Sequence, residues 1–214
     1  MNYSSRKKNK TVKFIIIHYT GMRDLNSAYF KLNDRNSNVS CHYLISRSGL
    51  IYNLLCPSFK AWHAGKSQWK NKINLNDYSI GIELENRGHE YGYDYYTRRQ
   101  YLSINILIKF LIKNFHIAEH NIIYHSDIAP NRKKDPGEKF YIDNINIKRF
   151  KKKPPFNKIK SLNSLLKTYG FSKIYLKKYR SYCIMAVKRS LNYKLINSVV
   201  SKKFKSDFYN LLFK

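Results

Sequence analysis

The sequence predicts an α/β fold, in which a central mixed β-sheet is flanked by helices and a small all-α domain follows. Two short apolar runs, residues 12–18 and 78–84, are typical of buried strands. Between residues 97 and 115, apolar side chains recur at spacings of three and four, as on one face of an amphipathic helix. Three further helical stretches after residue 158 predict the second, helical domain.

The first half of the chain contains most of the strand signals. From the N-terminus we expect a frayed basic tail at residues 1–10, a strand at 12–18 and a helix at 24–38. A hairpin at 41–55 and a second strand at 78–84 follow. Arg47, Ser48 and Gly49 form the hairpin turn. Gly81 lies inside the second strand, where glycine often marks the close approach of another backbone or a ligand.

The second half is mainly helical. Thr97 can cap the amphipathic helix, and residues 121–125 form a short strand before a loop with two prolines, at 126–138. The predicted catalytic domain covers residues 11–150, followed by a Lys- and Pro-rich linker at 151–157 and the helical domain at 158–214. Its helices, at 159–169, 179–191 and 201–212, are short and must pack on one another.

The chain carries a net charge of +28, unevenly distributed. Residues 148–214 contain 19 basic side chains and one acidic one, which gives this segment +18 and leaves +10 for the rest. Such a charge attracts polyanions such as nucleic acid, anionic lipid or acidic wall polymers. The alternative is that an A+T-rich coding sequence, which favours Lys, Asn, Ile and Tyr, accounts for it.

Several protein classes are excluded or disfavoured. No apolar run approaches the roughly 18 to 20 residues that a membrane helix needs. Three cysteines without a pattern do not make a disulfide framework or a Cys-rich metal site. The apolar core near the N-terminus is too short for a secretory signal, so we expect a cytoplasmic location, with periplasmic location by a non-standard export route as the alternative.

Two histidines end predicted strands, where active sites often form. They are His18 and His125, and Asp135 follows His125 by ten residues in the proline-containing loop. Two histidines and one carboxylate are a common ligand set for catalytic Zn²⁺, with the fourth position left for water. From spacing alone, ordinary structural roles for these three residues remain open.

Five segments carry a family resemblance. They occur in the order FIIIHYTG, VSCHYLI, AWHAG, NDYSIGIELEN and HSDIAPNRKKDPG, at residues 14–21, 39–45, 61–65, 76–86 and 125–137. Together they resemble the amidase-2 family of zinc-dependent N-acetylmuramoyl-L-alanine amidases, over about residues 12–145. This family is related to phage lysozyme amidases and peptidoglycan recognition proteins. The segments are most similar to its AmiD and AmpD branch.

The resemblance implies roles for particular residues. It implies one Zn²⁺ per chain, bound by His18, His125 and Asp135. It also implies that Glu83 is the catalytic acid/base. Glu85 is the rival, because strand alternation places Ser79, Gly81, Glu83 and Glu85 on one face.

Other roles follow from the same resemblance. Lys133 would stabilise charge on the substrate carbonyl, whereas we expect Lys134 to face solvent. Tyr19, Trp62 and His63 are the candidate substrate-binding residues, and a core position for His63 is the alternative. The remaining histidines have no matching role in the family. We expect a structural role for His42 and surface positions for His89, His116 and His120.

The implied reaction is hydrolysis of the amide bond between N-acetylmuramic acid, including its 1,6-anhydro form, and L-alanine of the stem peptide. The expected partners are peptidoglycan fragments or muropeptides in wall turnover or recycling. AmpD-type proteins carry a basic residue at the position of Asn74, so a range that includes ordinary muramyl substrates is expected. Residues 158–214 resemble the small peptidoglycan-binding module of AmiD, and a generic basic helical tail is the alternative.

Two other function classes compete with this hypothesis. A non-catalytic peptidoglycan receptor is disfavoured, since Asp135 completes the ligand set that such receptors lack. A basic nucleic-acid or membrane-surface binder would show base-stacking or groove-entry motifs, and the sequence has none. No specific nucleic acid is therefore expected as a partner, and the oligomeric state is left open.

Overall fold

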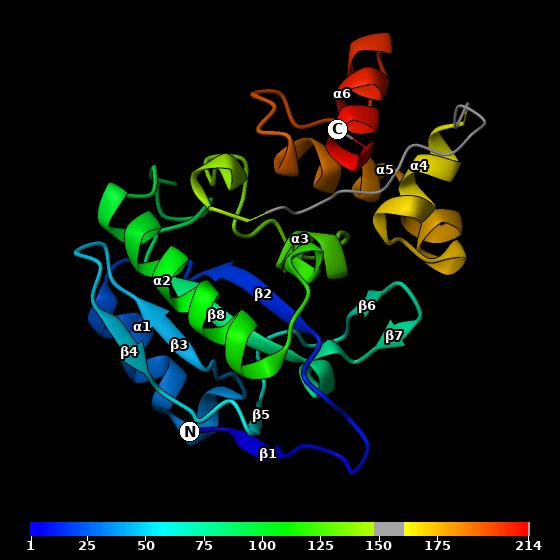
Figure 1. Ribbon diagram of the computed structural model, residues 1–214. Helices are drawn as coiled ribbons and strands as arrows, with labels where there is room; N and C mark the ends of the chain where they lie inside the picture. Colours follow the sequence, from blue (N-terminus) through cyan, green and yellow to red (C-terminus); the bar gives the residue numbers. More distant parts are fainter. Residues whose placement is uncertain (148–160, 214) are drawn as a thin grey trace.

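The computed structural model describes residues 1–147 and 161–213 and confirms the α/β prediction (Figure 1). A five-stranded sheet has the strand order β4-β3-β8-β2-β9. Its strands are β2 (Phe14–Tyr19), β3 (Tyr43–Ile45), β4 (Ile51–Asn53), β8 (Ser79–Leu84) and β9 (Ile122–Tyr124). Four of them are parallel, and β4 pairs antiparallel with β3 as the predicted hairpin, so the sheet is mixed.

Strand β2 lies inside the sheet because its first four residues are all apolar and suit burial on both faces. Ile15 and Ile17 face α2 (Arg98–Phe115), whose apolar side belongs to the same core cluster. Phe14 and Ile16 face the opposite way and join a second cluster. Thr97 caps α2 through its hydroxyl, which accepts the backbone N–H of Gln100, as predicted.

The second cluster includes the C-terminal helices. These are α4 (Leu162–Tyr169), α5 (Lys173–Ser190) and α6 (Lys202–Phe213). Helix α4 contacts both α5 and α6, and α5 contacts the short helix α3 (His125–Ile128), which lies beside it in Figure 1. Trp69 packs edge-on against Tyr169, and the N–H of Lys70 donates to the carbonyl of Gly170. The C-terminal helices therefore share one core with the catalytic part. The predicted linker at 151–157 lies outside the described residues, and the domain boundaries stay a prediction.

The predicted frayed tail at residues 1–10 is wrong for its first half. Strand β1 (Tyr3–Ser5) pairs antiparallel with β5 (Phe59–Ala61). The half-buried Arg6 guanidinium then donates hydrogen bonds to the carbonyls of Pro57, Asn76 and Ser79. The basic side chain that suggested solvent exposure is held by backbone oxygens instead.

The remaining elements are short or differ slightly from expectation. Helix α1 is Leu25–Asn33, the strands β6 and β7 are Gln68–Trp69 and Lys72–Ile73, and four single 3-10 turns are Arg35–Ser37, Leu75–Tyr78, Glu119–Asn121 and Ile142–Asn144. Helix α5 begins six residues earlier than predicted because Ser172 caps it, and its dihedral angles break at Tyr179.

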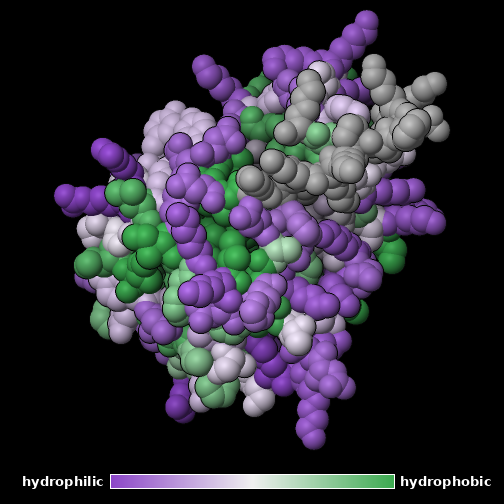
Figure 2. Space-filling model, viewed as in Figure 1, coloured by the Kyte–Doolittle hydropathy of each residue, from purple (hydrophilic) through white to green (hydrophobic). Residues whose placement is uncertain are grey.

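The surface is largely hydrophilic, with apolar patches near α2 in the view of Figure 2. Leu102, Ile106 and Phe110 are exposed large apolar side chains on α2. Among the described residues, no helix combines the length and the apolar character needed to cross a bilayer.

Candidate metal centre and active-site cavity

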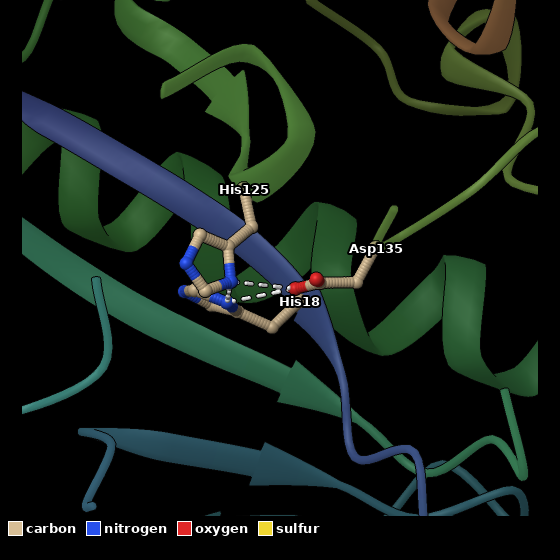
Figure 3. Close-up of side chains that lie close together, drawn as sticks. All are labelled: His18, His125 and Asp135. Atoms are coloured by element: carbon tan, nitrogen blue, oxygen red, sulfur yellow. Dashed lines mark hydrogen bonds and ion pairs between the residues drawn. The ribbon is translucent and has the colours of Figure 1, made fainter. Parts of the chain in front are cut away.

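The predicted metal ligands converge at the carboxyl end of the sheet. His18 lies near the end of β2, and His125 directly follows the neighbouring strand β9 as the first residue of α3. The Nδ1 atoms of the two histidines are 2.9 Å apart, and Oδ2 of Asp135 lies 3.0 Å and 2.9 Å from them. Figure 3 shows these side chains pointing toward one point.

This cluster has the chemistry of a metal site. The three ligand atoms lie within 4.8 Å of one another, and all three side chains are buried. Burial and the charge of His125 lower the pKa of His18 to about 4. Burial alone would raise the pKa of Asp135, but the charges and hydrogen bonds of His125 and His18 lower it overall. A neutral imidazole at His18, an ionised carboxylate at Asp135 and the Nδ1 atom of His125 face each other, and this donor set fits a divalent cation.

Each histidine is held by its other ring nitrogen. Nε2 of His125 lies 3.3 Å from the carbonyl oxygen of Ala64, to which it can donate. Nε2 of His18 lies 2.9 Å from Nδ1 of His63. Hydrogen bonds of this kind hold the ring of a metal-binding histidine in position.

A cavity of about 320 Å³ opens at the cluster, and Glu83 lines it together with the three ligands. Glu83 is the direct neighbour of His18 in the pairing of β8 with β2, so both side chains lie on one face of the sheet. Its Oε2 atom is buried without a hydrogen-bond partner among the described residues. Burial and the charge of Asp135 raise the pKa of Glu83 well above its ordinary value, while Lys133 opposes this shift.

The rival carboxylate is engaged elsewhere. Oε2 of Glu85 accepts the backbone N–H of Arg47 at 2.7 Å and lies outside the cavity that contains the three ligands. Lys133 lines the cavity and is partly buried, whereas the cavity-lining Lys134 is exposed, as expected.

Tyr19, a predicted substrate-binding residue, begins a row of polar contacts whose other members were given no role by the sequence: His89, Glu138 and Arg189. Tyr19 lines the cavity, and its hydroxyl lies 2.9 Å from Nδ1 of His89. Nε2 of His89 lies 3.3 Å from the carboxylate of Glu138, which lies 3.8 Å from Nε of Arg189 in α5. His89 was expected at the surface without a role. It is partly buried instead, because Tyr93 stacks on its ring.

The other candidate residues occupy different places. His63 is buried, as in its alternative core position, and it also lines the cavity, while its role in substrate binding stays a prediction. Trp62 does not line this cavity, and its indole nitrogen lies 3.5 Å from Ser4 of β1. His42 is structural, as predicted, because its Nδ1 accepts the N–H of Gly81. His116 and His120 are exposed, as predicted.

Residues 8–138 match the family described as N-acetylmuramoyl-L-alanine amidase, of the amidase-2 type. This segment contains all three clustered ligands and covers more than half of the chain. The chain belongs to this amidase family. The predicted family and fold class are thereby confirmed.

Known members of the amidase-2 family resemble the chain over different lengths. AmiD of Escherichia coli is 41% identical over 141 residues, which cover 60% of this chain and 50% of AmiD. The 1,6-anhydro-N-acetylmuramyl-L-alanine amidase AmpD of E. coli is 33% identical over 158 residues, 65% of this chain and 83% of AmpD. The sequence match to AmiD thus spans only half of its length.

The structural match is wider. The structure of E. coli AmiD in complex with anhydro-N-acetylmuramic acid-L-Ala-D-γ-Glu-L-Lys superimposes with a TM-score of 0.79 and 28% identity. It covers 96% of this chain and 91% of the AmiD chain. The similarity to an amidase-2 structure therefore extends beyond the segment matched by the family.

Proposed function

We propose that this chain is a zinc-dependent N-acetylmuramoyl-L-alanine amidase. It hydrolyses the amide bond between N-acetylmuramic acid, including its 1,6-anhydro form, and L-alanine of the stem peptide. The observation that supports this most directly is the position of Glu83, a buried carboxylate on the same cavity as His18, His125 and Asp135.

His18, His125 and Asp135 would hold one Zn²⁺, and the ion would lower the pKa of a bound water to about 7 and polarise the substrate carbonyl. The Glu83 carboxylate takes a proton from the water that attacks the carbonyl carbon, and gives it to the amine nitrogen as the C–N bond breaks. Burial favours the protonated form of Glu83, so this side chain can hold that proton between the two transfers.

Lys133 supplies positive charge at the cavity, where negative charge develops on the carbonyl oxygen. Lys133 is a partly buried residue, and a positive charge beside a partly buried cavity stabilises an oxyanion more strongly than it would in bulk water. Lys134 is more exposed than Lys133.

The cavity wall suits an acidic peptide. Five cationic side chains line it, namely Lys31, Arg87, Arg132, Lys133 and Lys134. The stem peptide bound to AmiD contains γ-linked glutamate, whose α-carboxylate is free in such a linkage. Cationic walls attract such groups. Tyr19 lines the same cavity and would contact the substrate there. Asn74 is consistent with action on both anhydro and ordinary forms. The cytoplasmic location expected from the sequence stays a prediction.

Mass spectrometry of the products tests the reaction. The protein is incubated with anhydro-N-acetylmuramyl-tripeptide and, separately, with intact peptidoglycan, each with and without a zinc chelator. Release of free tripeptide that stops with chelator and returns with Zn²⁺ supports the proposal. Zinc-loaded protein that cleaves neither substrate refutes it.

A matched pair of variants tests the assignment of the acid/base. Glu83→Gln should abolish hydrolysis and leave muropeptide binding, whereas Glu85→Gln, the same change two residues away, should retain activity. Binding without hydrolysis in the wild-type protein would favour the non-catalytic receptor instead.

A further inference from the structure

Four groups form a continuous hydrogen-bonded chain behind the candidate metal centre. Nε2 of His18 lies 2.9 Å from Nδ1 of His63, and Nε2 of His63 lies 3.1 Å from the hydroxyl of Ser79. That hydroxyl donates to the carbonyl oxygen of Leu75 at 2.6 Å. We call this set the Leu75–His18 chain.

The direction of each hydrogen bond in the Leu75–His18 chain follows from the carbonyl group of Leu75. A carbonyl oxygen only accepts, so the single hydroxyl proton of Ser79 goes to Leu75. The hydroxyl oxygen must then accept from His63, which places a proton on Nε2 of His63. In the neutral imidazole the other nitrogen is an acceptor. Nδ1 of His63 therefore accepts from His18, and the proton of His18 lies on Nε2.

The outcome is a bare Nδ1 on His18, and this is the atom that faces His125 and Asp135. We propose that His63 and Ser79 are positioning residues that select the His18 tautomer able to bind a metal through Nδ1. This inference rests on the proposed metal site. It assigns a role to two residues that contact neither the metal ligand atoms nor the bond to be cleaved.

The local packing supports a dedicated arrangement. A Cβ atom at Gly81 would lie 2.5 Å from Cγ of His63, so the imidazole can lie across β8 only because residue 81 has no side chain. The backbone N–H groups of His63 and Ala64 also donate to Oδ1 of Asn76, at 3.1 Å and 2.7 Å. The imidazole of His63 thus packs on β8 at Gly81, and its backbone is fixed by the hydrogen bonds to Asn76.

The two histidine ligands differ in how they are held. His125 donates to the backbone oxygen of Ala64, which can only accept, so its tautomer needs no further support. His18 faces another imidazole, which can either donate or accept. Within residues 1–147 and 161–213, the Ser79 hydroxyl, through its bond to Leu75, is the group that decides between these two states of His63.

The tautomers can be read directly by NMR. In protein with ¹⁵N-labelled histidine, long-range ¹H–¹⁵N spectra should show a proton on Nε2 of His18 and of His63, with and without Zn²⁺. On adding Zn²⁺, the Nδ1 resonances of His18 and His125 should shift as metal-bound nitrogens, whereas neither nitrogen of His63 should do so. A His63 protonated on Nδ1, or His18 bound through Nε2, would overturn the inference.

Zinc affinity, measured by competition with a chromophoric chelator, gives a second readout. Ser79→Ala and His63→Leu should weaken binding about 10- to 100-fold, the usual effect of losing an outer partner of a ligand. His63→Asn, which keeps an acceptor near Nδ1, should bind more tightly than His63→Leu. Ser103→Ala removes a serine that likewise donates to a backbone carbonyl, but away from the site, and should leave affinity unchanged.

The outcomes separate this inference from the proposed function. Wild-type protein that binds no Zn²⁺ refutes the proposed function. The histidine tautomers of the metal-free protein still test the proton directions in the Leu75–His18 chain. Wild-type protein that binds Zn²⁺, with Ser79→Ala and His63→Leu unchanged in affinity, refutes the positioning role alone.

Discussion

Replacing Tyr169 by Phe should destabilise the whole protein, because this residue joins the C-terminal helices to α3. Its hydroxyl donates to Oδ1 of Asp127 at 2.8 Å, and neither side chain is exposed to solvent. A hydrogen bond to a carboxylate contributes about 1.5–3 kcal/mol. Ser190 lies 3.4 Å from the same oxygen and can replace part of the bond, so we expect a loss of about 2 kcal/mol.

Urea and thermal unfolding measure this loss. For a chain of this size, about 2 kcal/mol lowers the melting temperature by about 4–8 °C. Tyr182→Phe is the matched control, since this ring on α5 is exposed and should change stability by less than about 0.5 kcal/mol.

The same experiment tests whether the C-terminal helices and the sheet unfold together. Trp69 packs against Tyr169 and Phe171, so in a Trp62→Phe background its fluorescence reports on the interface. One shared core predicts that fluorescence and circular dichroism give a single coincident transition. Two separated transitions, or a Tyr169→Phe variant as stable as the control, would refute the reasoning.

Three further changes probe the same framework. Gly81→Ala puts a Cβ 2.5 Å from His63 and should cost about 1–3 kcal/mol in thermal unfolding of the metal-free protein. Arg6→Met deprives three backbone carbonyls of their donor and should cost at least about 2 kcal/mol, whereas the exposed Lys7→Met should be neutral in the same urea titration. Burial lowers the pKa of His42 from 6.5 to about 3, so between these pH values the unfolded state binds the extra proton and stability falls as pH falls. His42→Asn lacks this titration, and its stability relative to wild type should rise by about 2 kcal/mol from pH 7 to pH 5; a constant difference would contradict the assigned pKa.

The parts of the fold that the sequence predicts well have local signals. The apolar run at 14–17 identifies β2, and Thr97 with its periodic apolar residues identifies α2. The metal ligands could be predicted because each lies within a recognisable segment: His18 and His125 at the ends of β2 and β9, and Asp135 in the loop after α3. These features depend on neighbours within a few residues, which is the range that a single sequence reports.

The parts that were missed depend on distant pairings. Strand β1 has only three residues and no apolar alternation, and it forms because β5 offers an unpaired edge. His89 meets Tyr19 across 70 residues, and nothing in its own segment indicates that contact. A usable signal did exist for His63, since a glycine inside a predicted strand indicated that some group must lie close to it.

The candidate site depends on the register of one strand pair. Residues 79, 81 and 83 of β8 pair with residues 14, 16 and 18 of β2 and share one face of the sheet. Along that face, Ser79 accepts from His63, Gly81 leaves room for its ring, and Glu83 reaches the cavity beside His18. A shift of one residue would turn all three to the other face, toward α2. Ile80 and Ile82 alternate with these residues and fill the core beneath α2. Because their burial fixes the register of β8, they also fix the positions of Ser79 and Glu83 relative to His18.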